Sequence, residues 1–123
     1  MGVRVSLDDD VLTAFVEGDI DHHTAKDLRE AIDEHAEKHG PALLKLDFSG
    51  VQFMDSSGIG LMMGRFKLMN SIGGKLKVIN VPKSLERMVK LSGLMALGIF
   101  ETFEKKEEKK NGKRIKRNEF KLF

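Results

Sequence analysis

Alternating hydrophobic and polar positions open the chain. Apolar residues occupy every second position at Val3, Val5 and Leu7, and again at Leu12, Ala14 and Val16. Because successive side chains of a strand point to opposite faces, this alternation predicts a β-hairpin with one buried face. Residues 43–48 are almost continuously apolar, which is typical of a central strand covered on at least one face. Residues 75–80 predict one more strand.

Other stretches carry apolar residues at the three- and four-residue spacing of an amphipathic helix. Residues 24–39 form the first, with charge pairs such as Arg29 and Asp33 on the polar face. A second helix, rich in core-type methionines, covers residues 56–72, and a short third helix begins at Pro82. Strands that alternate with helices after a hairpin predict an α/β domain with a mixed sheet and helices packed on it.

Length and composition limit the possible chemistry. The chain of 123 residues is long enough for a single domain with one core. It has no cysteine, which excludes disulfides, thiolate zinc sites and cysteine nucleophiles, and its four histidines are scattered. We therefore expect no metal and no cofactor. The N-terminus has no basic and apolar leader, and no apolar run reaches the roughly 20 residues of a membrane span, so we expect a cytoplasmic protein.

Charge separates the chain into two parts. Residues 104–123 hold nine Lys or Arg and four Glu, a net charge of +5, whereas residues 1–103 carry a net charge of −3. We expect a domain over 1–103 and a charged, mobile basic tail over 104–123. The tail is either a solvated appendix or an arm that binds nucleic acid, an acidic protein or an anionic membrane surface, with Phe120, Leu122 and Phe123 as a weak apolar anchor. An altered reading frame or a cloning end would also produce it.

The motif Asp55-Ser56-Ser57-Gly58 stands where the second helix is expected to begin. Asp and Ser are N-cap residues, so a serine hydroxyl is predicted beside unpaired N–H groups and the positive helix end, a place suited to a phosphate. The glycines nearby leave the site open to a partner's active site. The alternative is that these residues do no more than cap the helix.

Two kinds of enzyme find little support in the motifs. The spacing of Gly58, Gly60 and Gly64 does not match a dinucleotide-binding loop, and there is no P-loop motif. A serine hydrolase would need Ser56 to meet His22 or His23 and Asp21, yet no G-x-S-x-G elbow accompanies the serine. We keep the hydrolase as an alternative and do not expect an enzyme.

Four segments in order resemble the bacterial anti-sigma factor antagonists of the STAS domain family. They are GDIDHHTA at 18–25, FMDSSGIG at 53–60, SIGGKLKVIN at 71–80 and LSGL at 91–94. The combination is most similar to the sporulation antagonists of the sigma factor F pathway, over residues 3–101. The resemblance implies the STAS fold, a single domain with a mixed four- to five-stranded sheet that starts with a hairpin.

The resemblance also implies a partner-switching function. The unphosphorylated antagonist binds an anti-sigma factor that is also a serine kinase and frees the sigma factor, so that it is a positive regulator of sporulation-type transcription. The kinase, which binds the ATP, then phosphorylates the antagonist on the first serine of DSSG, here Ser56, and binding ends. A PP2C-like serine phosphatase resets the switch. The domain itself is not expected to bind DNA, and we expect a monomer when it is free.

Further residues are candidates for the docking surface, although each has a plainer explanation. The segment Asp19 to His22 forms part of the docking face in the resembling family, but Asp21 also suits a helix cap. Asp55 either caps the second helix or orients Ser56, and Ser57 is a second possible phosphoacceptor. The predicted partner-binding set is Asp19, Asp21, His22, Asp55, Ser57, Gly58, Gly93 and Leu94.

Overall fold

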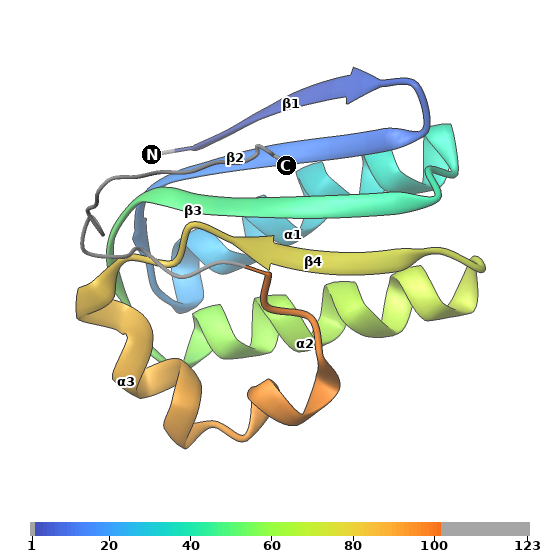
Figure 1. The fold of residues 1–123 in the computed structure, drawn as a ribbon. Coiled ribbons are helices and arrows are strands. Elements are labelled where there is room, and N and C mark those ends of the chain that lie inside the picture. Colours follow the sequence, from blue (N-terminus) through green and yellow to red (C-terminus); the bar gives the residue numbers. More distant parts are fainter. Residues whose placement is uncertain (1, 102–123) are drawn as a thin grey trace, which may run out of the picture.

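The computed structural model describes residues 2–101 of the chain as one α/β domain (Figure 1). The predicted tail, residues 104–123, lies outside the described residues, and the boundary at 103 stays a prediction. The elements follow in the order β1 (Gly2–Asp8), β2 (Val11–Ile20), α1 (His22–His39), β3 (Leu43–Met54), α2 (Ser56–Ser71), β4 (Lys75–Ile79), α3 (Lys83–Leu91) and the 3₁₀ helix η1 (Leu94–Leu97).

The four strands form one mixed sheet in the order β1-β2-β3-β4. β1 and β2 are antiparallel and make the predicted hairpin, whose turn contains Asp9 with a φ of 60°. β2, β3 and β4 are parallel to one another. An isolated parallel bridge between Val78 and Phe100 adds a minimal fourth pairing, beside β4. The expected mixed sheet with an N-terminal hairpin is therefore confirmed.

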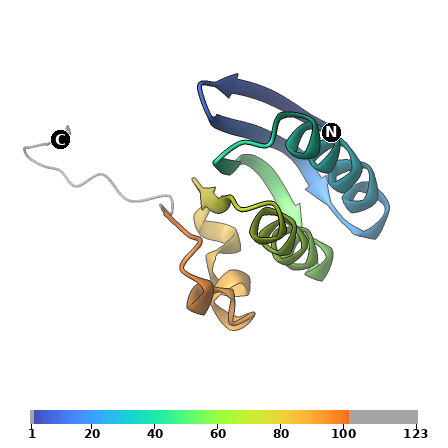
Figure 2. The ribbon, with the colours of Figure 1, turned by 90° about the vertical axis from the view of Figure 1, so that its right-hand side faces the viewer.

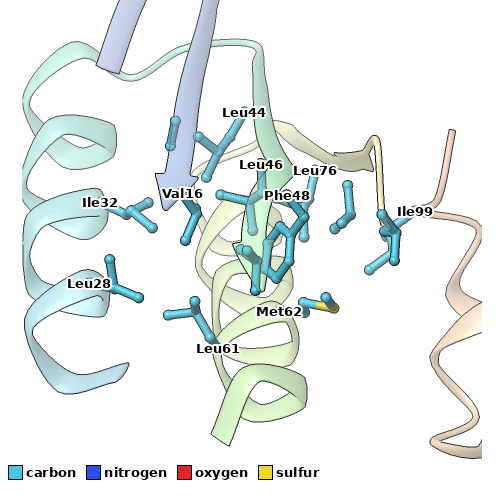
Figure 3. Packing of buried hydrophobic residues seen from close by; sticks show 14 of the residues in the cluster. Val16, Leu28, Ile32, Leu44, Leu46, Phe48, Leu61, Met62, Leu76 and Ile99 are labelled. Carbon is cyan, nitrogen blue, oxygen red and sulfur yellow. The ribbon is translucent and has the colours of Figure 1, made fainter. Parts of the chain in front are cut away.

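The helices α1 and α2 lie side by side on one face of the sheet, and α3 with η1 lies beyond β4 (Figures 1 and 2). The side chains on the helix-covered face form the core, since Leu44, Leu46 and Phe48 of β3 are fully buried. Leu28 and Ile32 of α1 and Met62 of α2 pack toward them (Figure 3). The methionines of α2 thus serve as core residues, as their spacing predicts.

The helix and strand boundaries differ from the sequence prediction mainly in β3. The apolar run ends at Phe48, but the strand continues to Met54 because its backbone keeps pairing with β2 beyond irregularities near Glu17 and Gly18. α1 begins two residues earlier than predicted, at His22, because Asp21 acts as its N-cap. The extra length of β3 brings the DSSG segment directly beside the end of β2.

Candidate functional site

The candidate site is built from two strand-to-helix junctions of the same form. β2 ends at Ile20 and β3 at Met54, which are paired in register, and each is followed by an aspartate that caps a helix. The amide of Asp55 donates a hydrogen bond of 3.1 Å to the carbonyl of Ile20. The first turns of α1 and α2 are therefore held side by side at the carboxyl ends of parallel strands, where open α/β sheets commonly bind ligands.

Asp21 forms a complete capping box at the start of α1. Its Oδ1 accepts hydrogen bonds from the amides of His23 at 2.9 Å and Thr24 at 3.0 Å, while the Thr24 hydroxyl oxygen accepts one from the Asp21 amide at 2.9 Å. The Thr24 and His23 amides hold the pKa of the Asp21 carboxyl below its ordinary value, because they stabilise the ionised form. Asp21 is thus a capping residue, whether or not it also meets a partner.

At the second junction the cap is an aspartate, which leaves the serines available. Asp55 is the N-cap of α2, and its Oδ1 accepts a 2.8 Å hydrogen bond from the Ser57 amide. Ser56 is the first helical residue and is exposed, whereas Ser57 is half-buried. Because Asp55 performs the capping, the helix does not require the hydroxyl of Ser56 for that purpose.

The two serines face different grooves. Ser57 shares the groove between α1 and α2 with His22, Lys26, Arg29 and the bare backbone of Gly60. Ser56 instead lies in the groove between α2 and α3, which is lined by Ser56, Ile59, Ser84, Arg87, Met88, Leu91 and Ser92. Sequence reasoning from the residues left the two serines equivalent, but the structure gives each a distinct environment.

Gly58 is buried, and packing explains why a glycine stands there. A Cβ at this position would lie 2.1 Å from Cγ and 2.2 Å from Sδ of Met54, whose side chain is only 2% exposed. By contrast, a Cβ at Gly60 or Gly64 would meet nothing within 4 Å. Gly58 therefore lets α2 approach the end of β3, so its place in the predicted docking set has a structural explanation beside the functional one.

The remaining predicted residues occupy less similar positions. Asp19 is exposed near the end of the strand β2, and His22 is exposed at the start of α1, where its ring lies 4.0 Å from that of His23. Gly93 is exposed just after the end of α3 with a φ of 85°, the left-handed conformation expected of a glycine there. Leu94 is 2% exposed, so its side chain belongs to the core.

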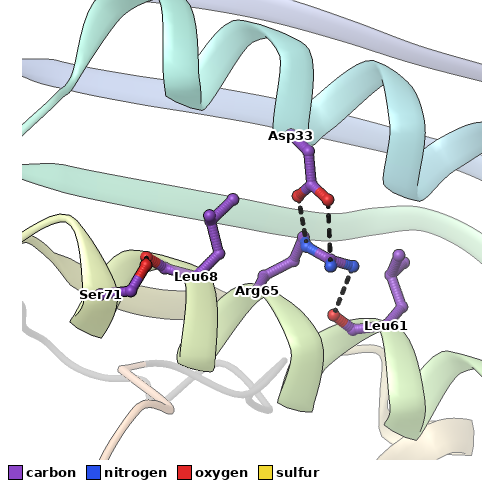
Figure 4. A network of polar contacts seen from close by, with 5 residues as sticks. All are labelled: Asp33, Leu61, Arg65, Leu68 and Ser71. Carbon is purple, nitrogen blue, oxygen red and sulfur yellow. Dashed lines mark hydrogen bonds and ion pairs between the residues drawn. The ribbon is translucent and has the colours of Figure 1, made fainter.

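An ion pair between a buried arginine and a half-buried aspartate lies beside the site and was not predicted from the sequence. Arg65 of α2 is 5% exposed, and its Nε lies 2.7 Å from the carboxylate of Asp33 on α1 (Figure 4). Its other two nitrogens donate hydrogen bonds to Asp33 and to the carbonyl of Leu61. The prediction that Asp33 pairs with Arg29 on the polar face is wrong, because Asp33 turns toward α2. Burial raises the pKa of Asp33 and lowers that of Arg65, against the attraction between them.

Other kinds of site find no support in residues 2–101. The carboxylate of Asp21 is occupied by backbone amides, and His22 shares a groove with Ser57 rather than Ser56, so the hydrolase arrangement is not assembled. Within the same residues, no group of three or more His, Asp or Glu side chains lies close enough to hold a metal ion. No helix of the described part is long and apolar enough to cross a membrane.

The structure has a mixed sheet that starts with an N-terminal hairpin, and helices pack on it. The family model of the STAS domain matches residues 3–109 of this chain. The chain belongs to the STAS domain family. Among curated proteins it is similar to the anti-sigma F factor antagonist of Paenibacillus polymyxa, with 37% identity over 87 residues, which are 71% of this chain and 74% of the relative. The anti-sigma-B factor antagonist of Bacillus subtilis is 33% identical over 94 residues, 76% of this chain and 84% of the relative.

Solved structures show the same fold. The anti-sigma factor antagonist SpoIIAA in its unphosphorylated form superimposes with a TM-score of 0.71 at 22% identity, over 82% of this chain and 87% of SpoIIAA. Its phosphorylated form from Bacillus gives a TM-score of 0.63 at 23% identity, over 82% of this chain and 90% of that one. The STAS fold expected from the sequence is therefore confirmed.

Proposed function

We propose that this chain is an anti-sigma factor antagonist controlled by phosphorylation of Ser56. In its unphosphorylated form it binds an anti-sigma factor that is also a serine kinase, and the sigma factor is released. The kinase then modifies Ser56 and binding ends, until a PP2C-like serine phosphatase removes the phosphate. The chain acts in the cytoplasm as a substrate and binding partner rather than as an enzyme.

The position of Ser56 is the observation that carries this proposal. Its side chain is exposed on the first turn of α2, and Asp55 already performs the capping. In phosphoryl transfer the kinase supplies the metal, the ATP and the catalytic base, so the substrate needs only an accessible hydroxyl. The Ser56 Oγ forms a bond to the γ-phosphorus of ATP as the bond to ADP breaks, and its proton passes to the base of the kinase.

The charge of a phosphate explains how binding would end without unfolding. A phosphoserine carries roughly −1.5 to −2 charges, which the N-terminus of its own helix tolerates well. The same charge is unfavourable for a partner that brings carboxylates toward Asp19, Asp21 and Asp55. Both relatives described above are named as antagonists of anti-sigma factors, which supports this partner class.

The proposal is tested by mixing the full chain with an anti-sigma kinase and Mg-ATP and mapping the phosphate by mass spectrometry. We expect one phosphate on Ser56, which is absent in Ser56→Ala and present in the matched variant Ser57→Ala. Transfer to Ser57 alone, or no transfer with any such kinase, would overturn the assignment.

The downstream pathway is tested by a choice between partners. We propose the sporulation-type sigma F pathway because the DHHT, MDSSG and LSGL segments resemble its antagonists, and the 37% identical relative carries that name. Titration calorimetry against a sigma-F-type and a sigma-B-type anti-sigma factor should show tighter binding to the first. Tighter binding to the second would move the chain to the sigma-B-type pathway while leaving its antagonist role intact.

A further inference from the structure

The groove between α2 and α3 is lined by both the predicted phosphorylation site, Ser56, and a cation, Arg87. Of the described residues that line it, Arg87 alone carries a charge. Ser56 contributes from the α2 side, whereas Ser84, Arg87, Met88 and Leu91 contribute from α3. Since residues three or four apart share a helix face, Ser84 and Arg87 lie one turn apart on the wall opposite Ser56.

Arg87 has no partner of its own within residues 2–101. Its helix neighbour Glu86 instead forms an ion pair of 3.6 Å with Lys90. Ser84 is exposed, and no hydrogen bond to its hydroxyl is found among the described residues. The wall that faces Ser56 thus offers a free guanidinium and a free hydroxyl, which are both groups that bind phosphate oxygens.

We infer that Arg87 is the intramolecular ligand of phosphorylated Ser56, with the Ser84 hydroxyl as a second donor. This inference rests on the proposed function and names what the protein itself does with the phosphate. An unmodified serine gives the guanidinium no charge to pair with, whereas a phosphate accepts two parallel hydrogen bonds from it. The contact therefore forms only after modification.

The consequence is a second means of ending partner binding. A phosphate held between Ser56 and Arg87 bridges α2 and α3 above the apolar floor of the groove. Met88 and Leu91, which are 37% and 75% exposed in the unmodified protein, would then lie behind this bridge. Phosphorylation would close an apolar surface as well as repel acidic groups.

The test uses the full chain with phosphoserine installed at position 56 during translation, so that no kinase is needed. The second pKa of the phosphate is measured by ³¹P NMR, in the folded protein and in urea. We expect the folded protein to show a value at least about half a unit lower than in urea, because the guanidinium favours the dianion. The variant Arg87→Gln should lose this shift, and Arg87→Lys should keep part of it.

The control is Lys83→Gln, which removes the same charge from the same helix but outside the lining of this groove. It should titrate like the unmodified sequence. If Arg87→Gln and Lys83→Gln titrate alike, the effect is one of net charge and the inference is overturned. Because the phosphate is installed directly, this outcome is independent of whether a kinase modifies Ser56, so the two proposals fail separately.

Discussion

Replacing Gly58 with alanine tests whether this glycine is required by packing at the β3–α2 junction. The added methyl group would overlap Cγ and Sδ of Met54, at 2.1 and 2.2 Å, in a region where Met54 is 2% exposed. Inserting a methyl into a packed core costs about 1–3 kcal/mol. Alanine is also the better helix former by about 1 kcal/mol or less, which offsets part of this cost. We expect a net loss of about 1–2 kcal/mol in the free energy of unfolding.

Gly64→Ala is the matched substitution on the same helix. A Cβ there meets nothing within 4 Å, so only the helix preference remains and the variant should gain about 0.5–1 kcal/mol. Urea unfolding followed by circular dichroism measures both changes. The two variants should therefore move the midpoint in opposite directions.

A double variant identifies the cause of the loss. If the overlap with Met54 is responsible, Met54→Ala should cost less in the Gly58→Ala background than in the original sequence, because the new methyl occupies part of the space. Equal stability of Gly58→Ala and the original chain would refute the packing argument. Gly58 would then be explained by partner contact alone.

Three further predictions concern the helices around the site. Arg65→Met should destabilise the fold by about 2–4 kcal/mol in urea unfolding, because it leaves the Asp33 carboxylate without its partner. Adding Asp33→Leu should recover much of this loss. Full stability of the single variant would contradict the prediction. The pKa of Asp21 lies below its ordinary 3.8 in the folded state, so its stabilising effect is complete above that pH and is lost as the pH falls further. Asn at position 21 also caps a helix but does not titrate. The free energy of unfolding, measured between about pH 5 and pH 2, should therefore fall less steeply for Asp21→Asn than for the original sequence. Parallel pH profiles would contradict the capping account. Leu91→Ser should weaken binding to the anti-sigma factor at least about tenfold in calorimetry, with the stability of the fold unchanged. The control Ile72→Ser, at the far end of α2, should leave binding unchanged. Equal effects of the two variants would exclude the groove between α2 and α3 as a docking surface.

Much of the fold was predictable because local patterns and tertiary packing agree. The alternation of apolar and polar residues from Val3 to Val16 correctly predicted the hairpin, and the helical spacing of apolar residues correctly predicted α1 and α2. The end of β3 was not predictable in this way. Ser49 and Gly50 interrupt the apolar run, and the strand conformation beyond them depends on backbone pairing with β2, which is a long-range interaction.

The start of α2 was predictable from the sequence, whereas the structural role of each residue around it was less so. The DSSG motif correctly predicted the start of α2, but residue type alone does not determine whether Asp55, Ser56 or Ser57 caps the helix. The burial of Arg65 was not predictable, because a charged residue in an apolar helix is expected to be exposed unless its partner on another helix is known. Asp33 had a nearer apparent partner in Arg29, so local spacing gave the wrong pairing.

The hydroxyls of Ser56 and Ser57 are neighbours in the sequence but lie in two different grooves. Side chains of successive helix residues point in directions about 100° apart around the helix axis. A phosphate on Ser57 instead of Ser56 would therefore place its charge in the groove between α1 and α2 rather than in the groove between α2 and α3. The proposed kinase would therefore have to distinguish two chemically identical hydroxyl groups by their position along the helix alone. Conversely, one change in kinase register would give the same sequence a different output, and this offers a simple route by which related switches can diverge without altering the fold.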